Sequence, residues 1–291
     1  MSQLVSFLPV ACAVPLALLG PLARRSTLAF AWSWACAALV AMASVEWASG
    51  SLVESSTPAW TPAARFAAGA LSFCPFMSVL GSKRPHEQAW QWIVLSLWGI
   101  LVLPAAEWLV LRRGVSLEIH GVRAWFLLVL IVVQATHALG TRAWFAGLSL
   151  AAAQTIFFAA WLPGFGGPLE RWLLATCGEP TRHVAVWTCV GVSFAALRWS
   201  WRTRASRSPR DRVWLDFRDR FGTLWSLRVM ERVQAAAHTE RTPWRLHWNG
   251  FSASTDSPPG FPVSLDHALW NLLRRFVTPE WCAARGWQVP E

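Results

Sequence analysis

Long runs of apolar residues without charge fill the first two thirds of the chain, and charged residues become frequent only after about Trp199. A bilayer core about 30 Å thick is crossed by roughly 20 mainly apolar residues in a helix. These runs are apolar on every side, whereas the strands of a membrane barrel alternate apolar and polar positions. Stretches of sufficient length lie at 3–22, 27–45, 63–82, 90–111, 123–139, 144–162 and 182–199. The pattern predicts an all-α polytopic membrane bundle of about seven transmembrane helices over residues 1–199.

The rest of the chain, residues 200–291, has the pattern of a small α+β region on the cytoplasmic side. Apolar Trp244, Leu246 and Trp248 alternate with polar residues before a turn-prone Asn249-Gly250, which favours a short strand. Ser264 is a suitable N-cap for a terminal helix. The predicted elements are a basic linker at 200–212, an amphipathic helix at about 212–238, a strand and turn at about 243–251 and the terminal helix at about 264–276.

The amphipathic helix has two contrasting faces. Aromatic and aliphatic residues follow helical spacing along one face, at Trp214, Phe217, Phe221, Leu224 and Trp225. Charged residues form the other, at Arg212, Asp216, Asp219 and Arg220. Such a helix suits the membrane surface, or it packs on its own small domain. The amphipathic helix and the basic linker before it together predict that residues 200–291 lie against the inner leaflet or the cytoplasmic loops. The expected membrane-surface contacts are Arg202, Arg204, Arg207, Trp214, Phe217, Phe221 and Trp225.

Composition and charge support the membrane assignment. The chain is 54% hydrophobic and only 14% charged, where soluble domains carry about 25% charged residues. Its net charge is +10, but the basic residues mostly flank apolar runs, so nucleic acid is not an expected partner. Arg24-Arg25 follow the first run and a dense arginine cluster follows the last. The positive-inside rule then predicts the cytoplasmic (inner) membrane, with the N-terminus outside and the C-terminus cytoplasmic.

Motifs for enzymatic chemistry are missing from the sequence. It contains no P-loop, G-x-G-x-x-G, H-E-x-x-H, G-x-S-x-G or kinase signature. Its six cysteines are scattered without a C-x-x-C pair, so neither a zinc site nor a disulfide framework is indicated. We therefore predict no metal, no catalytic residue and no cofactor, and we do not favour an enzyme.

Polar residues at membrane depth are costly and are the next candidates for function. They are Gln134, His137, Gln154 and Glu107. Gln134 and His137 share one helix face, which suits a proton relay, a haem ligand or an interhelical hydrogen bond. His120 and His183 lie near the outer ends of predicted spans, so His120, His137 and His183 are the candidates for holding a haem or metal.

Three functions fit this pattern. The first is a non-enzymatic scaffold or subunit that sits in the lipid bilayer and anchors a protein partner at the cytoplasmic face. The second is a transporter for a small solute or a lipid, which agrees with the prolines inside predicted spans, Pro9, Pro15, Pro75 and Pro104. The third is a histidine-dependent redox or metal protein of the membrane.

Overall fold

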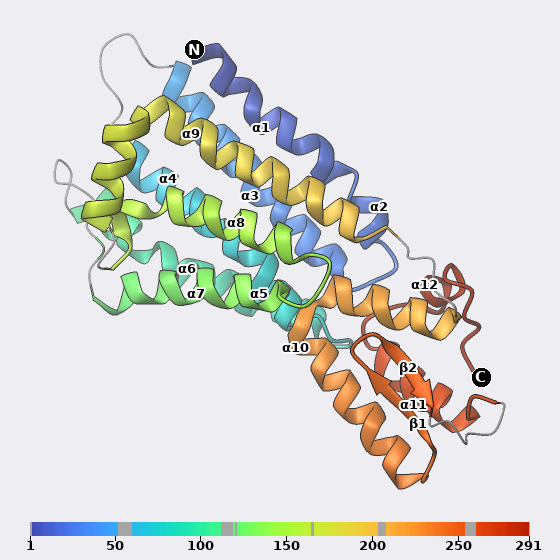
Figure 1. Ribbon diagram of the computed structural model, residues 1–291. Coiled ribbons are helices and arrows are strands. Elements are labelled where there is room, and N and C mark those ends of the chain that lie inside the picture. The colour runs from blue at the N-terminus through green and yellow to red at the C-terminus, as the bar shows by residue number, and fades with distance from the viewer. Residues whose placement is uncertain are drawn as a thin grey trace.

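The structure of the 291-residue chain is a computed structural model. It describes residues 2–51, 60–111, 119, 121–163, 166–202, 208–253 and 260–290. Most of this chain is helical, and a two-stranded sheet lies near the C-terminus. The N-terminal helices run side by side in one bundle, and the C-terminal elements gather at one end of it (Figure 1). The N-terminus lies at the opposite end of the bundle (Figure 1).

The bundle is built from apolar helices joined by short connections. Its elements are α1 (Ser2–Ala17), α2 (Gly20–Ala23), α3 (Leu28–Ser51), α4 (Thr61–Ala70), η1 (Leu71–Phe73), α5 (Cys74–Leu80), α6 (Glu87–Leu111), α7 (Val122–Ala138), α8 (Trp144–Phe157), η2 (Ala159–Trp161) and α9 (Gly166–Ser200). The segment from α4 to α5 is nearly continuous, because the 3-10 turn η1 joins the two helices end to end.

The prediction of an apolar helical region is confirmed, but the prediction of seven long spans is not. Within the described residues, three segments are long and apolar enough to cross a membrane: Leu28–Ser49, Thr61–Leu80 and Glu87–Val110. The other apolar segments in the bundle are shorter, namely Leu8–Ala23, Val122–Ala138 and Trp144–Phe157. A helix rises 1.5 Å per residue, so the 14 residues of α8 do not span 30 Å. In α9, Arg182 and Arg198 limit the apolar part to positions 183–197.

The C-terminal region contains α10 (Pro209–Thr239), β1 (Trp244–His247), β2 (Gly250–Ala253), α11 (Val263–Leu273) and α12 (Pro279–Ala283). Strands β1 and β2 pair antiparallel with His247 opposite Gly250, so Trp248 and Asn249 form the turn. This is one residue earlier than the sequence suggests. The predicted single helix over 212–238 is also interrupted, because Gly222 has φ 75° and ψ −176°. Only glycine adopts such a conformation readily, and the two halves of α10 change direction there (Figure 1).

Backbone hydrogen bonds attach the C-terminal region to the connections of the bundle. The Thr27 N–H donates to the Phe276 carbonyl at 2.9 Å, and the Thr278 N–H donates to the Arg25 carbonyl at 3.1 Å. The Arg84 N–H donates to the Arg275 carbonyl at 2.8 Å. The segment after α11 therefore lies between two connections of the bundle, and the two parts of the chain are in direct contact.

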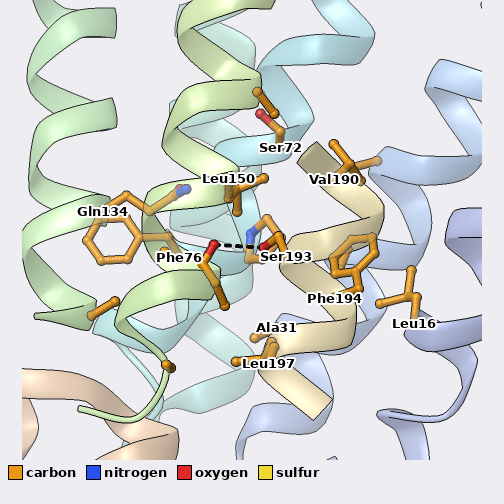
Figure 2. Close-up of a pocket in the computed structure, with 18 of the residues that line it drawn as sticks. Leu16, Ala31, Ser72, Phe76, Gln134, Leu150, Val190, Ser193, Phe194 and Leu197 are labelled. Atoms are coloured by element: carbon orange, nitrogen blue, oxygen red, sulfur yellow. Dashed lines mark hydrogen bonds between the residues drawn. The ribbon is translucent and has the colours of Figure 1, made fainter. Parts of the chain in front are cut away.

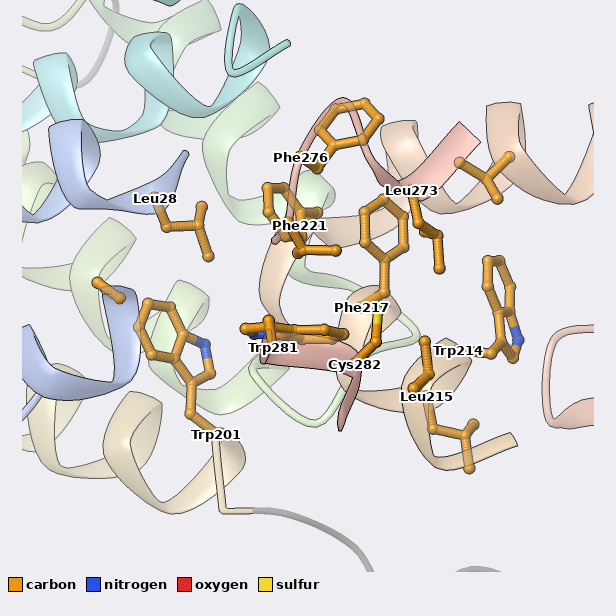
Figure 3. Packing of buried hydrophobic residues seen from close by; sticks show 14 of the residues in the cluster. Leu28, Trp201, Trp214, Leu215, Phe217, Phe221, Leu273, Phe276, Trp281 and Cys282 are labelled. Atoms are coloured by element: carbon orange, nitrogen blue, oxygen red, sulfur yellow. The ribbon is translucent and has the colours of Figure 1, made fainter. Parts of the chain in front are cut away.

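The prediction that Trp214, Phe217 and Phe221 contact the membrane surface is wrong. All three side chains are fully buried, in a hydrophobic cluster with Phe276 and Trp281 (Figure 3). The same cluster continues into α1, α2 and the end of α9, so the aromatic face closes a core within the protein and does not face lipid.

The other predicted surface contacts have mixed outcomes. Trp225 is partly buried, and its indole N–H donates to the Val79 carbonyl at 2.9 Å. Arg202 is exposed and lies over the Trp199 ring. Arg204 and Arg207 lie outside the described residues. Surface contact by Arg202 and the linker remains a prediction.

Candidate functional site

A cavity of about 260 Å³ lies inside the bundle, between helices that are far apart in the sequence. Its lining comes from α1, α3, α4, η1, α5, α7, α8 and α9, and from the part of α10 around its kink at Gly222. Apolar side chains form most of the wall, for example Leu16, Phe76, Leu150, Val190 and Phe194 (Figure 2). A mostly apolar cavity with a few polar groups is the usual form of a small-molecule site.

Two buried glutamines form a polar chain across one wall of this cavity. Gln134 on α7 donates from Nε2 to Gln154 Oε1 on α8 at 3.1 Å. Gln154 in turn donates from Nε2 to Ser72 Oγ at 3.0 Å. The Oε1 atom of Gln134 accepts no hydrogen bond from the described residues. The chain binds three helical segments together and leaves one fully buried acceptor, Gln134 Oε1, without a partner among the described residues.

Ser193 adds a second polar contact between helices that line the cavity. Its hydroxyl donates to the Ala146 carbonyl at 2.9 Å, which joins α9 to α8 (Figure 2). Because this hydroxyl satisfies its donor within the wall, it fixes the spacing of the two helices and leaves the cavity surface beside it mainly apolar.

His137 lies at the end of the cavity nearest the C-terminal region. Its Nε2 atom is 3.0 Å from the Phe221 carbonyl oxygen, and as a donor it satisfies that carbonyl at the kink of α10. The Phe76 ring lies edge-on, with 5.3 Å between ring centroids. A Cβ atom at Gly222 would overlap His137 Nε2. His137 therefore connects α7 to the kink of α10.

Two charged residues of α10, Asp219 and Arg220, line the same end of the cavity. Asp219 Oδ1 accepts hydrogen bonds from Arg218 at 2.8 and 3.1 Å and from the Arg142 N–H at 3.1 Å. Arg220 donates from Nη1 to the Leu22 carbonyl at 2.7 Å and from Nη2 to the Trp201 carbonyl at 2.9 Å. Both are buried side chains, although helical periodicity predicts a solvent-exposed face for them.

A buried ion pair between Asp216 and Arg285 lies near enough to Arg220 for its charges to act on it. Arg285 Nε donates to Asp216 Oδ2 at 2.8 Å, and the Arg285 guanidinium stacks on Trp281, 3.4 Å from the ring centroid. Burial raises the pKa of Asp216 above its usual value, even though the charges of Arg285 and Arg220 oppose the shift. Burial, together with the charge of Arg285, lowers the pKa of Arg220 to about 10, so Arg220 is still a cation at neutral pH.

The remaining candidates from the sequence lie elsewhere. Glu107 meets Arg123 at 3.4 Å in a pair that is half exposed, and neither residue lines the cavity. His183 lies on α9, is partly buried and is not part of the cavity wall. His120 lies outside the described residues, so the expected His120–His183 site is not tested. Across the described ranges, no cluster of three His, Cys, Asp or Glu residues is arranged to hold a metal ion.

The structure thus brings Gln134, His137 and Gln154 to one cavity and separates Glu107 and His183 from it. Sequence reasoning missed Asp219 and Arg220, although the run Asp216-Phe217-Arg218-Asp219-Arg220 has an unusual density of charge beside aromatic residues. No protein-family model matches the chain, and neither the curated proteins nor the solved structures contain a match to it.

Proposed function

We propose that the bundle lies in a lipid bilayer and binds a small, largely apolar molecule in its central cavity, as a lipid-handling protein or transporter does. The outer surface supports a lipid environment, because large apolar side chains such as Trp92, Ile100 and Val110 are 72%, 63% and 77% exposed. In water such a surface is unfavourable, whereas lipid accepts it without cost.

The charge distribution supports one orientation in that bilayer. Arg25, Arg84 and Arg142 contact the C-terminal region through their backbone atoms, so they share one end of the bundle with it. Basic residues concentrate on the cytoplasmic side of membrane proteins. We therefore assign this end to the cytoplasm and the N-terminal end, where Glu46 and Ser51 lie on α3, to the outside.

The cavity is the observation that carries the proposed function. It is a partly open cavity between helices of the bundle, with α10 lining one end, and its wall is apolar apart from a few polar groups at fixed positions. Gln134 lines the cavity, and its Oε1 atom, buried and without a partner among the described residues, is the acceptor that we assign to a ligand hydroxyl. A purely structural interface between helices does not need either the space or the unsatisfied acceptor.

Filling the cavity tests the proposal. The purified protein in detergent is titrated with decanol, and the bound fraction is measured by native mass spectrometry. Leu150→Trp places a larger side chain in the cavity and is expected to abolish binding. Leu148→Trp lies on the exposed side of the same helix and is the matched control. Equal binding of decanol by the wild type and by Leu150→Trp, or no binding by the wild type, would overturn the proposal.

The distal half of α10 favours a second function, the anchoring of a protein partner at the cytoplasmic face. Beyond Gly222 this half extends away from the bundle (Figure 1), and Leu224 and Leu227 are 47% and 48% exposed beside Arg228 and Glu231. An anchoring role predicts a protein that copurifies with the wild type and is lost from Leu224→Asp/Leu227→Asp. Recovery of the same protein with both forms would contradict it.

A further inference from the structure

We propose that the cavity binds a single-chain amphiphile with an acidic head group, and that Arg220 binds this head group. The inference rests on the ligand-binding function proposed above and assigns the chemical class of the ligand. It depends on the hydrogen bonds, burial and charge balance at the α10 end of the cavity.

Arg220 is a buried cation whose Nε–H has no hydrogen-bond acceptor among the described residues. Its side chain lines the cavity and the residue is only 7% exposed. Its two terminal nitrogens donate to the neutral carbonyls of Leu22 and Trp201, while Nε donates to no atom of the described residues. No carboxylate in that part of the chain forms an ion pair with it within 4.0 Å. A buried guanidinium without an anionic partner is costly, so its presence beside a cavity suits an anionic ligand.

The neighbouring acids already have other partners. Asp219 accepts from Arg218 and from the Arg142 backbone, and Asp216 accepts from Arg285. The buried group formed by Arg218, Arg220, Arg285, Asp216 and Asp219 therefore carries one positive charge more than negative charges. The Trp201 and Trp281 rings lie 5.3 and 5.7 Å from the Arg220 guanidinium carbon and stabilise this cation only in part.

The lowered pKa of Arg220 agrees with an excess of positive charge at this site. Burial and the like charge of Arg285 lower the pKa, and the negative charge of Asp216 raises it only in part. An acidic group bound beside Arg220 would supply the missing negative charge. A carboxylate suits the site because a guanidinium binds it through charge-assisted hydrogen bonds.

The rest of the cavity selects the tail of the ligand. From Arg220 the cavity extends into the bundle between Leu16, Leu150, Val190 and Phe194, which offer only apolar contacts. Pockets for drug-sized ligands usually measure about 300–1,000 Å³, so a cavity of about 260 Å³ suits one short hydrocarbon chain.

The test compares decanoate with decanol, which share a tail and differ in the head group, in titrations of the full-length protein followed by native mass spectrometry. A charge-assisted hydrogen bond at a buried site predicts that wild-type protein binds decanoate about tenfold more tightly than decanol. Arg220→Gln should bind the two molecules with affinities within about twofold of each other. Arg228→Gln, an exposed arginine on the same helix, is the matched control and should keep the wild-type preference.

The outcomes separate this inference from the proposed function. If wild-type protein binds decanol and decanoate equally, the acidic-ligand inference is wrong and the apolar site stands. If it binds neither, both proposals fail. If Arg220→Gln folds and retains the full preference for decanoate, Arg220 is not the head-group site. Should Arg220→Gln fail to fold, the wild-type comparison alone still decides whether an acidic head group is preferred.

Discussion

Arg285 donates a hydrogen bond of 2.8 Å to Asp216 although the two side chains are only 6% and 4% exposed. This ion pair lies where α10 meets the last helix of the chain, and it is covered by the Trp281 ring. A buried pair contributes little when both members are replaced together, but loss of one member leaves the other charge without a partner. The contact between Asp216 and Arg285 is therefore a sensitive point of the C-terminal region.

Removal of one member of this pair should destabilise the protein strongly. Asp216→Ala removes the oxygen that accepts from Arg285, whether or not Asp216 is ionised, and the buried donor left without an acceptor predicts a loss of about 3 kcal/mol in the free energy of unfolding. Glu107→Ala breaks the half-exposed pair with Arg123, and its expected loss is no more than about 1 kcal/mol. Thermal unfolding of the purified protein measures both. Similar losses for the two variants would show that the burial of Asp216 is not decisive.

The stability contribution of Asp216 should depend on pH in one direction. Because burial raises its pKa in the folded protein above the unfolded value, the folded state takes up the proton first as pH falls. Proton uptake by Asp216 therefore stabilises the folded protein fully at pH values below the pKa of Asp216 in the unfolded chain. This stabilisation is lost as pH rises through the higher pKa of Asp216 in the folded protein. The unfolding temperature of the wild type relative to Asp216→Asn should rise from pH 7 towards pH 4. A relative fall would mean that the ion pair lowers the pKa.

The kink of α10 should not tolerate a side chain. Gly222→Ala places a Cβ atom on a residue with φ 75°, where it overlaps His137 Nε2. Strain and overlap together should cost about 2–4 kcal/mol of unfolding free energy. Gly99→Ala is the matched control, because no atom lies within 4 Å of the added Cβ. Thermal unfolding compares them, and the addition of His137→Ala should recover part of the loss in Gly222→Ala.

His137 should act through structure and not as a cofactor ligand. His137→Gln keeps a donor near the Phe221 carbonyl and should cost no more than about 1 kcal/mol, the scale of a hydrogen bond between membrane helices. His137→Ala should cost more, because it also leaves a space against Phe76. Unfolding temperature and an absorbance spectrum of each variant are the measurements. A visible absorbance band that disappears in a folded His137→Gln protein would restore the haem interpretation.

The two ends of the bundle should face opposite sides of the membrane. Single cysteines introduced at Ser51 on α3 and at Arg245 on β1 of the full-length chain can be labelled by a membrane-impermeant maleimide in intact cells. Ser51→Cys should react before lysis and Arg245→Cys only after it, because the basic end is assigned to the cytoplasm. If both cysteines react in intact cells, the two ends do not face opposite sides of the membrane and the proposed orientation is wrong.

The sequence by itself determined the features that depend on local interactions. Apolar runs predict the bundle helices because in lipid each backbone group must be satisfied inside its own helix. Alternation at Trp244, Leu246 and Trp248 likewise predicts the hairpin formed by β1 and β2. It did not determine how long each helix remains apolar and continuous. Chain reversals and flanking charges leave α7 and α8 with only 17 and 14 residues.

The tertiary structure decided which polar residues are buried and what they meet. Helical periodicity separates α10 into an aromatic face and a charged face, and this treats the charged face as solvated. In the folded protein both faces of the segment before Gly222 are covered, because this segment lies between the C-terminal helices and the end of the bundle. Arg220 reaches the carbonyl of Leu22, 198 positions earlier, and Asp219 reaches the backbone of Arg142. Local pattern carries no information on contacts at such separation, so the charged end of the cavity emerged only from the packing of the whole chain.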